Sequence, residues 1–264
     1  MRKKDLLELL TTYKQNDIIE YINELSPHEE SLFMKNLENL DLKLVFDLQK
    51  NFCTGDYIPF AEESITIKPA QIIAIPETET EKREEKDARQ EGEALLREGK
   101  VAVLIVAGGQ GSRLGFDGPK GIYRISPIQQ KPLFQLFAEQ IKALSKRYCT
   151  RIPLLIMTSE ENYEETARFF EKNDYFNLGR DTIHFFRQDM LPAITPDGNL
   201  VLQNDFRLFT NPNGHGGSLK ALYDSGVLET LMKEGFAELY YCQVDNPLAK
   251  IADRIDIKWI AERM

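Results

Sequence analysis

The chain has 264 residues, of which 42% are hydrophobic and 28% charged, and its formal net charge is −9. This composition predicts a globular protein with a sizeable core, and the acidic balance argues against broad nucleic-acid binding, which needs a basic surface. No apolar run approaches the ~20 residues of a membrane-spanning helix, so we expect no membrane partner. Three widely spaced cysteines, Cys53, Cys149 and Cys242, form neither a metal motif nor a disulfide framework, which favours a cytoplasmic location.

The first 50 or so residues predict a small helical unit. Leucine and isoleucine recur at helical spacing from Asp5 to Glu24, which predicts one amphipathic helix. Ser26 and Pro27 are typical of a helix start, and a short helix is expected over residues 42–49. This unit could be a cap or a partner-binding surface, or it could simply pack against the rest of the chain.

A linker is expected next, because three prolines interrupt residues 52–76. The charged stretch of residues 77–99 predicts a helix that ends at Gly99. Its charge run is more typical of a solvated helix face than of an interaction tail. We place the boundary between two domains, 1–78 and 79–264, at the start of this helix.

The most informative stretch runs from Val101 to Lys120. It opens with six apolar residues, four of them β-branched, which predict a buried strand of a parallel sheet. Four glycines follow within nine residues and allow main chain to approach a ligand closely. Arg113 and Lys120 add two positive charges, so the stretch predicts a seat for a polyphosphate. The glycine spacing matches neither a dinucleotide fingerprint nor a P-loop.

Helices and strands then alternate. Helices are expected over residues 132–148, 160–172 (capped by Ser159) and 218–234, strands over 152–157, 182–186 and 236–244, and a hairpin over 193–202. Such alternation predicts a mostly parallel α/β sheet with helices on both faces. Ligands bind outside the carboxyl ends of such strands, so the glycine loop, Gln188 and Asp245 should converge on one cleft.

The string GGQGSRLGFDGPKG, residues 108–121, resembles the signature of the sugar-nucleotide pyrophosphorylases. The strings FFRQDMLPAITPDG, NPNGHGG and YCQVDNPLAKIAD follow in the order typical of the UDP-sugar pyrophosphorylase family, which includes UDP-N-acetylglucosamine and UDP-glucose pyrophosphorylases. The resemblance covers most of residues 100–253 and is faint over the N-terminal helices. It implies a Rossmann-like nucleotidyltransferase sheet. The implied reaction joins UTP and a sugar 1-phosphate into a UDP-sugar, with pyrophosphate released.

The resemblance also implies roles for individual residues. Lys120 and Arg113 would be the catalytic cations, Asp245 would bind Mg²⁺, and Gln188 and Gly214 would recognise uracil. The other implied nucleotide contacts are Val106, Ala107, Gly108, Gly109, Gly111, Ser112, His215 and Gln243. Such roles suit the chemistry, because attack of one phosphate on another needs positioning and positive charge more than covalent catalysis.

Simpler explanations exist for several of these residues. Asp245 could cap a turn, Lys120 could be a surface lysine, His215 could be an ordinary loop histidine, and Arg113 could be a structural ion-pair partner.

The sequence departs from the family pattern in two ways. It ends soon after Asp253, whereas the family continues into a second half with most of the sugar contacts, a further metal-binding aspartate and a second phosphate-binding lysine. We therefore expect a C-terminally truncated chain with an incomplete catalytic domain. His215 stands where the N-acetylglucosamine branch usually has asparagine, which is more like the UDP-glucose branch. The leading hypothesis is a uridylyltransferase, and the alternative is a UTP-binding fragment without turnover.

Overall fold

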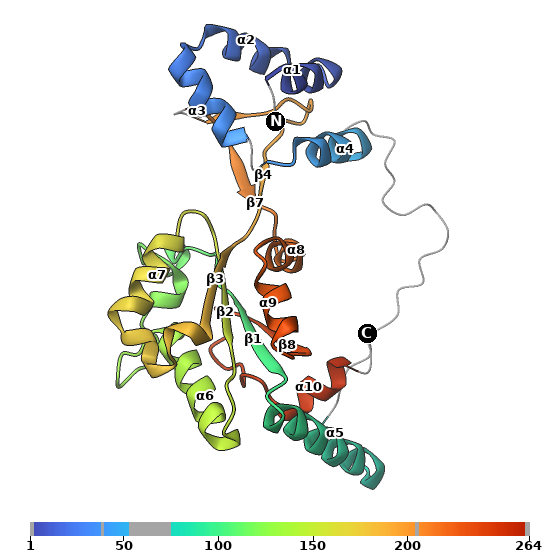
Figure 1. Cartoon of the computed structure of the whole chain (residues 1–264), viewed down its shortest axis with the longest axis vertical. Coiled ribbons are helices and arrows are strands. Elements are labelled where there is room, and N and C mark those ends of the chain that lie inside the picture. Colours follow the sequence, from blue (N-terminus) through green and yellow to red (C-terminus); the bar gives the residue numbers. More distant parts are fainter. Residues whose placement is uncertain (1–2, 38–39, 53–74, 204–205, 262–264) are drawn as a thin grey trace. The chain divides into compact units, whose positions relative to one another are not determined.

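The computed structural model describes residues 3–37, 40–52, 75–203 and 206–261 (Figure 1). These residues form two compact units. The first contains the described parts of Met1–Gln71 together with Met190–Asn213, and the second contains those of Ile72–Asp189 and Gly214–Met264. The predicted linker lies almost wholly outside the described residues, and the domain boundary at residues 78 and 79 stays a prediction.

Four helices begin the first unit. They are α1 (Lys3–Thr12), α2 (Asn16–Glu24), α3 (Pro27–Leu37) and α4 (Leu42–Phe52). The prediction of a single helix from Asp5 to Glu24 is wrong, because the chain breaks where Lys14 adopts a φ of +56°. The break lets Gln15 turn inward, where it is only 2% exposed. Its side-chain amide donates to the carbonyl of Gly198 at 2.9 Å and accepts from the amide of Leu200 at 2.7 Å.

Residues 190–213 complete the core of this first unit. Strand β4 (Met190–Pro192) pairs with β7 (Thr210–Pro212), and β5 (Leu202–Gln203) pairs with β6 (Arg207–Leu208), both antiparallel. The predicted hairpin is confirmed by an isolated bridge between Ile194 and Leu200. Leu200 and Leu208 are buried in one cluster with apolar side chains of α1 to α4.

A four-stranded parallel sheet organises the second unit. Its strands are β1 (Val101–Val106), β2 (Leu154–Thr158), β3 (Ile183–Arg187) and β8 (Glu238–Gln243), in the order β3-β2-β1-β8. The chain builds outward from β1 to β3 and then returns to add β8 on the other side of β1. The direction of building therefore reverses between β1 and β8, which is where parallel α/β sheets bind ligands.

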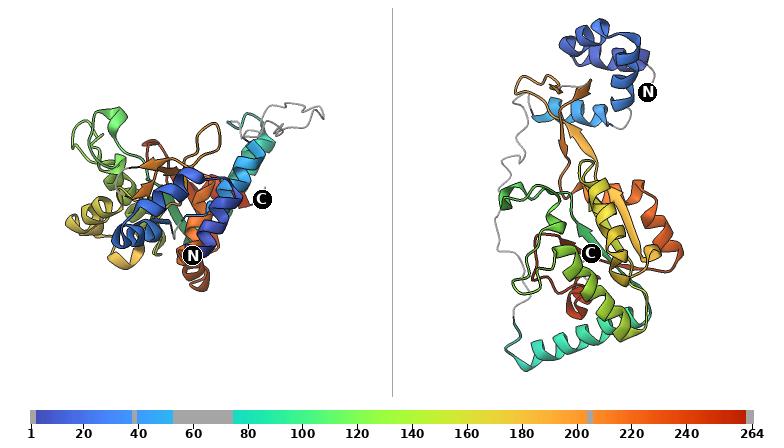
Figure 2. Two further views of the ribbon diagram at one scale, coloured as in Figure 1. Left: turned by 90° about the horizontal axis from the view of Figure 1, so that it is seen from above. Right: turned by 90° about the vertical axis from the view of Figure 1, so that its left-hand side faces the viewer.

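Helices cover both faces of this sheet, as the sequence predicted (Figures 1 and 2). Alternate residues of β1 point to opposite faces. Val101, Val103 and Ile105 share one core with side chains of α5 (Glu79–Arg97), α6 (Leu133–Tyr148), α7 (Tyr163–Lys172) and α10 (Arg254–Ala261). Ala102, Leu104 and Val106 share another with side chains of α8 (Gly217–Asp224) and α9 (Val227–Lys233).

Two expectations for the helices of this unit are wrong. The helix predicted over residues 218–234 is split into α8 and α9, because Gly226 adopts a φ of +74° between them. Ser159 does not cap α7. The N-cap residue is Asn162, and Ser159 is buried in the turn before it.

No helix within the described ranges is long and apolar enough to cross a membrane. Cys149 is an exposed free thiol and Cys242 a buried one, whereas Cys53 lies outside the described residues. Burial raises the pKa of the Cys242 thiol to about 12, so this thiol stays protonated and acts as a core side chain. The cytoplasmic location stays a prediction.

Helix α5 packs against α10 through a glycine, which leads to a stability prediction. A Cβ atom built on Gly92 would lie 1.8 Å from the carbonyl oxygen of Arg254. Alanine favours a helix interior over glycine by about 1 kcal/mol. Here main chain must move to admit the methyl group, and overpacking of this kind costs about 1–3 kcal/mol. We therefore expect Gly92→Ala to lower the thermal unfolding midpoint.

The matched control is Gln90→Ala, since Gln90 is an exposed residue of the same helix. It should leave the midpoint unchanged or raise it slightly. A rise for Gly92→Ala would show that α5 and α10 do not pack as described.

Candidate functional site

The glycine loop leaves the carboxyl end of β1 and folds back on itself. The amide of Gly111 donates to the carbonyl of Gly118 at 2.8 Å, and the amide of Lys120 donates to the carbonyl of Gly109 at 3.1 Å. Its far end is a short 3-10 helix, Ser112–Leu114. Val106 and Ala107 are buried at the base of the loop, while Gly109 is exposed. The loop thus presents main chain to solvent directly above a rigid strand.

Lys120 and Asp245 meet at the reversal point of the sheet. The Lys120 Nζ lies 3.0 Å from Asp245 Oδ2, and the Lys120 side chain is 13% exposed against 50% for Asp245. A Cβ atom on Gly109 would lie 3.4 Å from Lys120 Cε, so glycine leaves room for the lysine to reach across. The amide of Val244 donates to the carbonyl of Val106 at 3.0 Å, which aligns the ends of the two strands that carry the pair.

The electrostatics of this pair suit a phosphate and a divalent ion. The hydrogen bond from Lys120 holds the pKa of Asp245 below its usual range, against the opposing effect of burial. Asp245 is therefore a carboxylate at neutral pH. No group of three or more His, Cys, Asp or Glu residues in the described part of the chain could hold a metal by itself. A single carboxylate still fits Mg²⁺, which keeps several waters and is commonly bound through one or two carboxylates and substrate phosphates.

Gln188 lies against the start of the glycine loop. Its main-chain amide donates to the carbonyl of Thr158 at 2.8 Å, and the residue is 8% exposed. A Cβ atom on Gly108 would lie 3.1 Å from the Cδ, Nε2 and Oε1 atoms of Gln188, so the side-chain amide rests on the Gly108 main chain. That amide makes no hydrogen bond with any residue the structure describes. It is thus available to a ligand that carries both a donor and an acceptor, such as an imide.

The remaining predicted residues lie around these two contacts. His215 Nδ1 is 3.2 Å from the hydroxyl of Tyr241, and Gly214 adopts a φ of +76° just before it. Gln243 lies opposite Val106 in the sheet, but its side chain lines a separate hollow with Tyr240 and Asn246.

Arg113 and Ser112 are exposed on the 3-10 helix. Neither makes a side-chain hydrogen bond or ion pair within the described parts of the chain. The structure therefore brings Lys120 and Asp245 together, and Gln188 and Gly108 together, but it joins Arg113 to neither pair.

Sequence reasoning missed Asn162 and Tyr241. Asn162 is fully buried, and its Nδ2 donates to the carbonyl of Ala107 at 3.2 Å. The partners are 55 residues apart, so no local pattern marks this contact. Tyr241 carries no signal beyond its place near the end of β8, where side chains alternate between the two faces.

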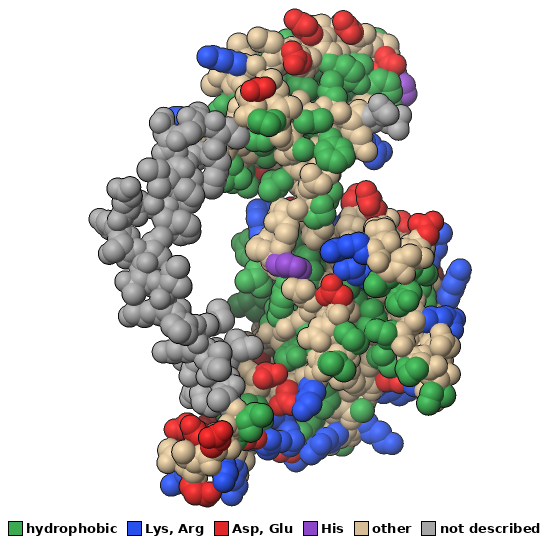
Figure 3. Space-filling model, turned by 180° about the vertical axis from the view of Figure 1, so that it is seen from behind, with side chains coloured by type: hydrophobic (Ala, Val, Ile, Leu, Met, Phe, Trp, Pro, Cys, Tyr) green, Lys and Arg blue, Asp and Glu red, His purple; other side chains and the backbone are tan. Residues whose placement is uncertain are grey.

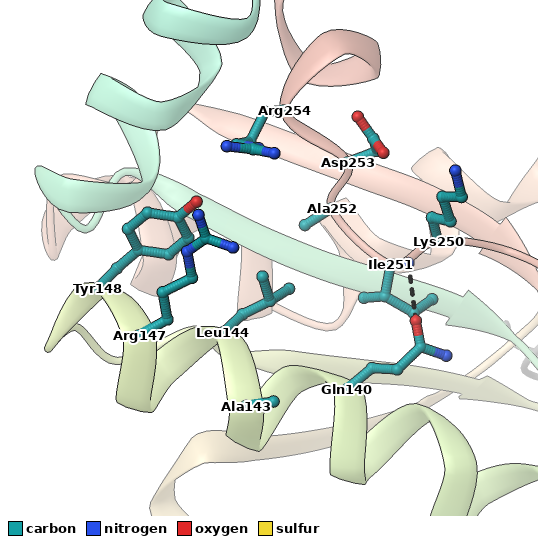
Figure 4. A pocket seen from close by; sticks show the side chains of 10 residues that line it. All are labelled: Gln140, Ala143, Leu144, Arg147, Tyr148, Lys250, Ile251, Ala252, Asp253 and Arg254. Atoms are coloured by element: carbon teal, nitrogen blue, oxygen red, sulfur yellow. Dashed lines mark hydrogen bonds between the residues drawn. The ribbon is translucent and has the colours of Figure 1, made fainter.

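Two surface features lie outside this cluster. On the face shown in Figure 3, basic and acidic side chains of the second unit are interspersed rather than gathered into one basic surface. A hollow of about 340 Å³ lies where α6 meets the turn before α10, with Arg147, Tyr148 and Arg254 among its lining residues (Figure 4). None of the predicted site residues lines this hollow.

Comparison with known proteins places this geometry in context. A family model described as UTP–glucose-1-phosphate uridylyltransferase matches residues 53–263. The UDP-N-acetylglucosamine diphosphorylase 2 of Arabidopsis thaliana is 36% identical over 259 residues, which cover 94% of this chain and 51% of that protein. The UDP-N-acetylglucosamine pyrophosphorylase of Saccharomyces cerevisiae is 30% identical over 96% of this chain and 55% of its own length.

A solved structure matches over nearly the whole chain. The uridine diphosphate N-acetylglucosamine pyrophosphorylase of Trypanosoma brucei, crystallised with an inhibitor, superposes with a TM-score of 0.80 and 28% identity. The match covers 99% of this chain and 55% of that one. The chain thus spans about half the length of the curated relatives it matches.

Proposed function

Because the chain belongs to the UTP–glucose-1-phosphate uridylyltransferase family, we propose that its second unit binds UTP across the glycine loop and serves uridylyl transfer to a sugar 1-phosphate. The observation that carries this proposal is the contact of Lys120 with Asp245 at the reversal point of the sheet, beside a loop of bare main chain. A cation and a carboxylate held there suit a nucleoside triphosphate.

The proposed reaction is an in-line displacement at the α-phosphate of UTP. An oxygen of the sugar 1-phosphate forms the new P–O bond, and the bond to the leaving pyrophosphate breaks. Lys120 offsets the negative charge that spreads over the phosphate oxygens in the transition state. Gln188 would hold the uracil imide with its free side-chain amide, and the amides of Gly108 and Gly109 would face the nucleotide.

Mg²⁺ would be held by Asp245 together with substrate phosphates and water. Its chemistry would be to neutralise phosphate charge. Because Lys120 keeps Asp245 ionised, the carboxylate needs no deprotonation at neutral pH to accept the ion. The proposed cofactor is therefore Mg²⁺, with Asp245 as its protein ligand.

The proposed sugar substrates are N-acetylglucosamine 1-phosphate and glucose 1-phosphate. The names of the curated relatives favour the first. The Gly-His-Gly sequence at residues 214–216 favours the second, because it resembles the UDP-glucose branch of the family. A panel of sugar 1-phosphates, assayed for pyrophosphate release with UTP and Mg²⁺, ranks them directly.

Binding and turnover need separate measurements, because the chain spans about half the length of its relatives. Calorimetry with UTP and Mg²⁺ tests binding, and pyrophosphate release from the same preparation tests catalysis. We expect UTP to bind in preference to ATP and NAD. Binding without turnover would support the alternative of a UTP-binding module, whereas a preference for ATP or NAD would contradict both.

Replacement of Gln188 tests nucleobase recognition. Methionine has a similar length but cannot pair with an imide. A hydrogen bond contributes about 0.5–1.5 kcal/mol, so the loss of two should weaken binding by about tenfold. We therefore expect Gln188→Met to raise the dissociation constant of UTP about tenfold in calorimetry. Gln135→Met, at a half-buried glutamine of α6 that bonds Glu139, is the matched control. Equal UTP affinity of the two variants would exclude Gln188 as a uracil contact.

A further inference from the structure

The hydrogen-bond ladder between β1 and β2 ends in an unusual way. The amide of Val103 donates to the carbonyl of Pro153 at 2.9 Å, and that of Ala107 donates to Met157 at 2.8 Å. Bonds in a parallel ladder alternate regularly between the two strands. The next one should run from the amide of Ser159 to the carbonyl of Ala107.

The side-chain amide of Asn162 occupies that position instead. Its Oδ1 accepts from the amide of Ser159 at 3.0 Å, and its Nδ2 donates to the carbonyl of Ala107 at 3.2 Å. The amide of Asn162 also donates to Ser159 Oγ at 3.3 Å. The side chain thus stands in for a peptide group and bridges the two strand ends.

The Asn162 side chain bridges the two strands instead of capping its own helix. An asparagine at a helix N-cap usually accepts a hydrogen bond from the first turn of its own helix. Asn162 is the N-cap residue of α7, yet its side chain makes no cap bond. It is fully buried and reaches 55 residues back along the chain. The contact is therefore specific to the start of the glycine loop.

The bridge determines where the first amide of the loop points. A trans peptide group is planar, so the carbonyl of Ala107 and the amide of Gly108 point in opposite directions. Asn162 holds that carbonyl on the β2 side, so the Gly108 amide points to the β8 side. There the ladder has already ended with the bond from Val244 to Val106, and no main-chain bond from Gly108 follows among the described residues.

We infer that Asn162 is a positioning residue that aims the free amide of Gly108 toward the end of β8, where Lys120 meets Asp245. The inference rests on the proposed function for its ligand, a nucleoside triphosphate, but its geometry is independent of that ligand. The same helix also flanks the far side of the loop, because a Cβ atom on Gly118 would lie 3.2 Å from Glu165 Oε1.

The test compares Asn162→Asp with Asn162→Ala. Aspartate keeps an oxygen for the Ser159 amide and is as good an N-cap residue as asparagine, but it cannot donate to Ala107 while ionised. Alanine removes both bonds. The control is Thr166→Val, a buried position of α7 whose hydroxyl has no hydrogen-bond partner. Each variant is measured by hydrogen exchange of the peptide that covers residues 107–111 and by calorimetry with UTP and Mg²⁺.

We expect both Asn162 variants to raise exchange at residues 107–111 and to raise the dissociation constant of UTP about tenfold, because small misplacements of binding groups are costly. Protection of α7 should persist in Asn162→Asp, which shows that the variant is folded. Thr166→Val should change neither measurement. Wild-type exchange and affinity in Asn162→Asp and Asn162→Ala would overturn the inference. Failure of the wild-type chain to bind UTP would instead overturn the proposed function, and exchange would still decide the role of Asn162.

Discussion

Replacing Lys120 by alanine is expected to lower the rate of pyrophosphate release by about 10²–10³. In enzymes that stabilise transition-state charge with preorganised groups, removal of one such group lowers the rate by about this factor. Lys120 is well placed for this role, since it is largely buried and held 3.0 Å from Asp245 beside Gly109. The measurement is the initial rate at saturating UTP, sugar 1-phosphate and Mg²⁺, together with UTP affinity by calorimetry.

Lys131→Ala is the matched control for this variant. Lys131 is also a partly buried lysine paired with a carboxylate, but its partner is Glu139, at 2.6 Å, rather than Asp245. It should retain the wild-type rate. Near-normal turnover and UTP affinity in Lys120→Ala would show that the lysine serves only the ion pair.

Replacing Asp245 by asparagine is expected to raise the Mg²⁺ concentration at half-maximal activity by at least about tenfold. Asparagine keeps an oxygen for the Lys120 ammonium but removes the negative charge that a divalent ion requires. Changes in the surroundings of bound metals already cost about 10–100-fold in affinity or activity. Titration of pyrophosphate release with Mg²⁺ gives the value.

The pH dependence of the wild type sharpens this test. Lys120 lowers the pKa of Asp245 from the ordinary aspartate value of about 3.9. The carboxylate is therefore ionised above that value and gains a proton only as the pH falls through the lowered pKa. Titration of Asp245 should therefore not change the Mg²⁺ requirement of wild-type activity between pH 8 and 5.

The control for Asp245→Asn is Asp224→Asn, at an exposed aspartate paired with Lys220, which should leave the Mg²⁺ titration unchanged. An unchanged Mg²⁺ requirement in Asp245→Asn would remove Asp245 from the metal site.

The sequence predicted the sheet of the second unit well, because its signals are local. The apolar run of Val101–Val106 and the glycines after it identify a buried strand and the turn that follows it without reference to the rest of the chain. The convergence of Lys120 and Asp245 was predicted because both follow strands of a parallel sheet, whose carboxyl ends lie at one edge. Neither residue type predicts it alone. The structure places the two side chains in contact, while their roles in catalysis stay predictions.

Two of the failures have a different cause, which is contact between distant segments. The break between α1 and α2 depends on Gln15 finding its partners at Gly198 and Leu200, which no helical periodicity reveals. Asn162 was similarly hidden. The sequence predicted it inside the helix of residues 160–172, and only the three-dimensional ladder shows that its side chain bridges two strands. The split between α8 and α9 differs, because Gly226 marks it locally in the sequence.

The buried amide of Gln15 has a consequence for how the chain folds as it is synthesised. Its two partners lie 183 and 185 residues further along, so these contacts cannot form until residue 200 has left the ribosome. Domains usually complete in order from the N-terminus. The first helices therefore lack these two contacts while strands β1 to β3 of the parallel sheet, residues 101–187, are synthesised.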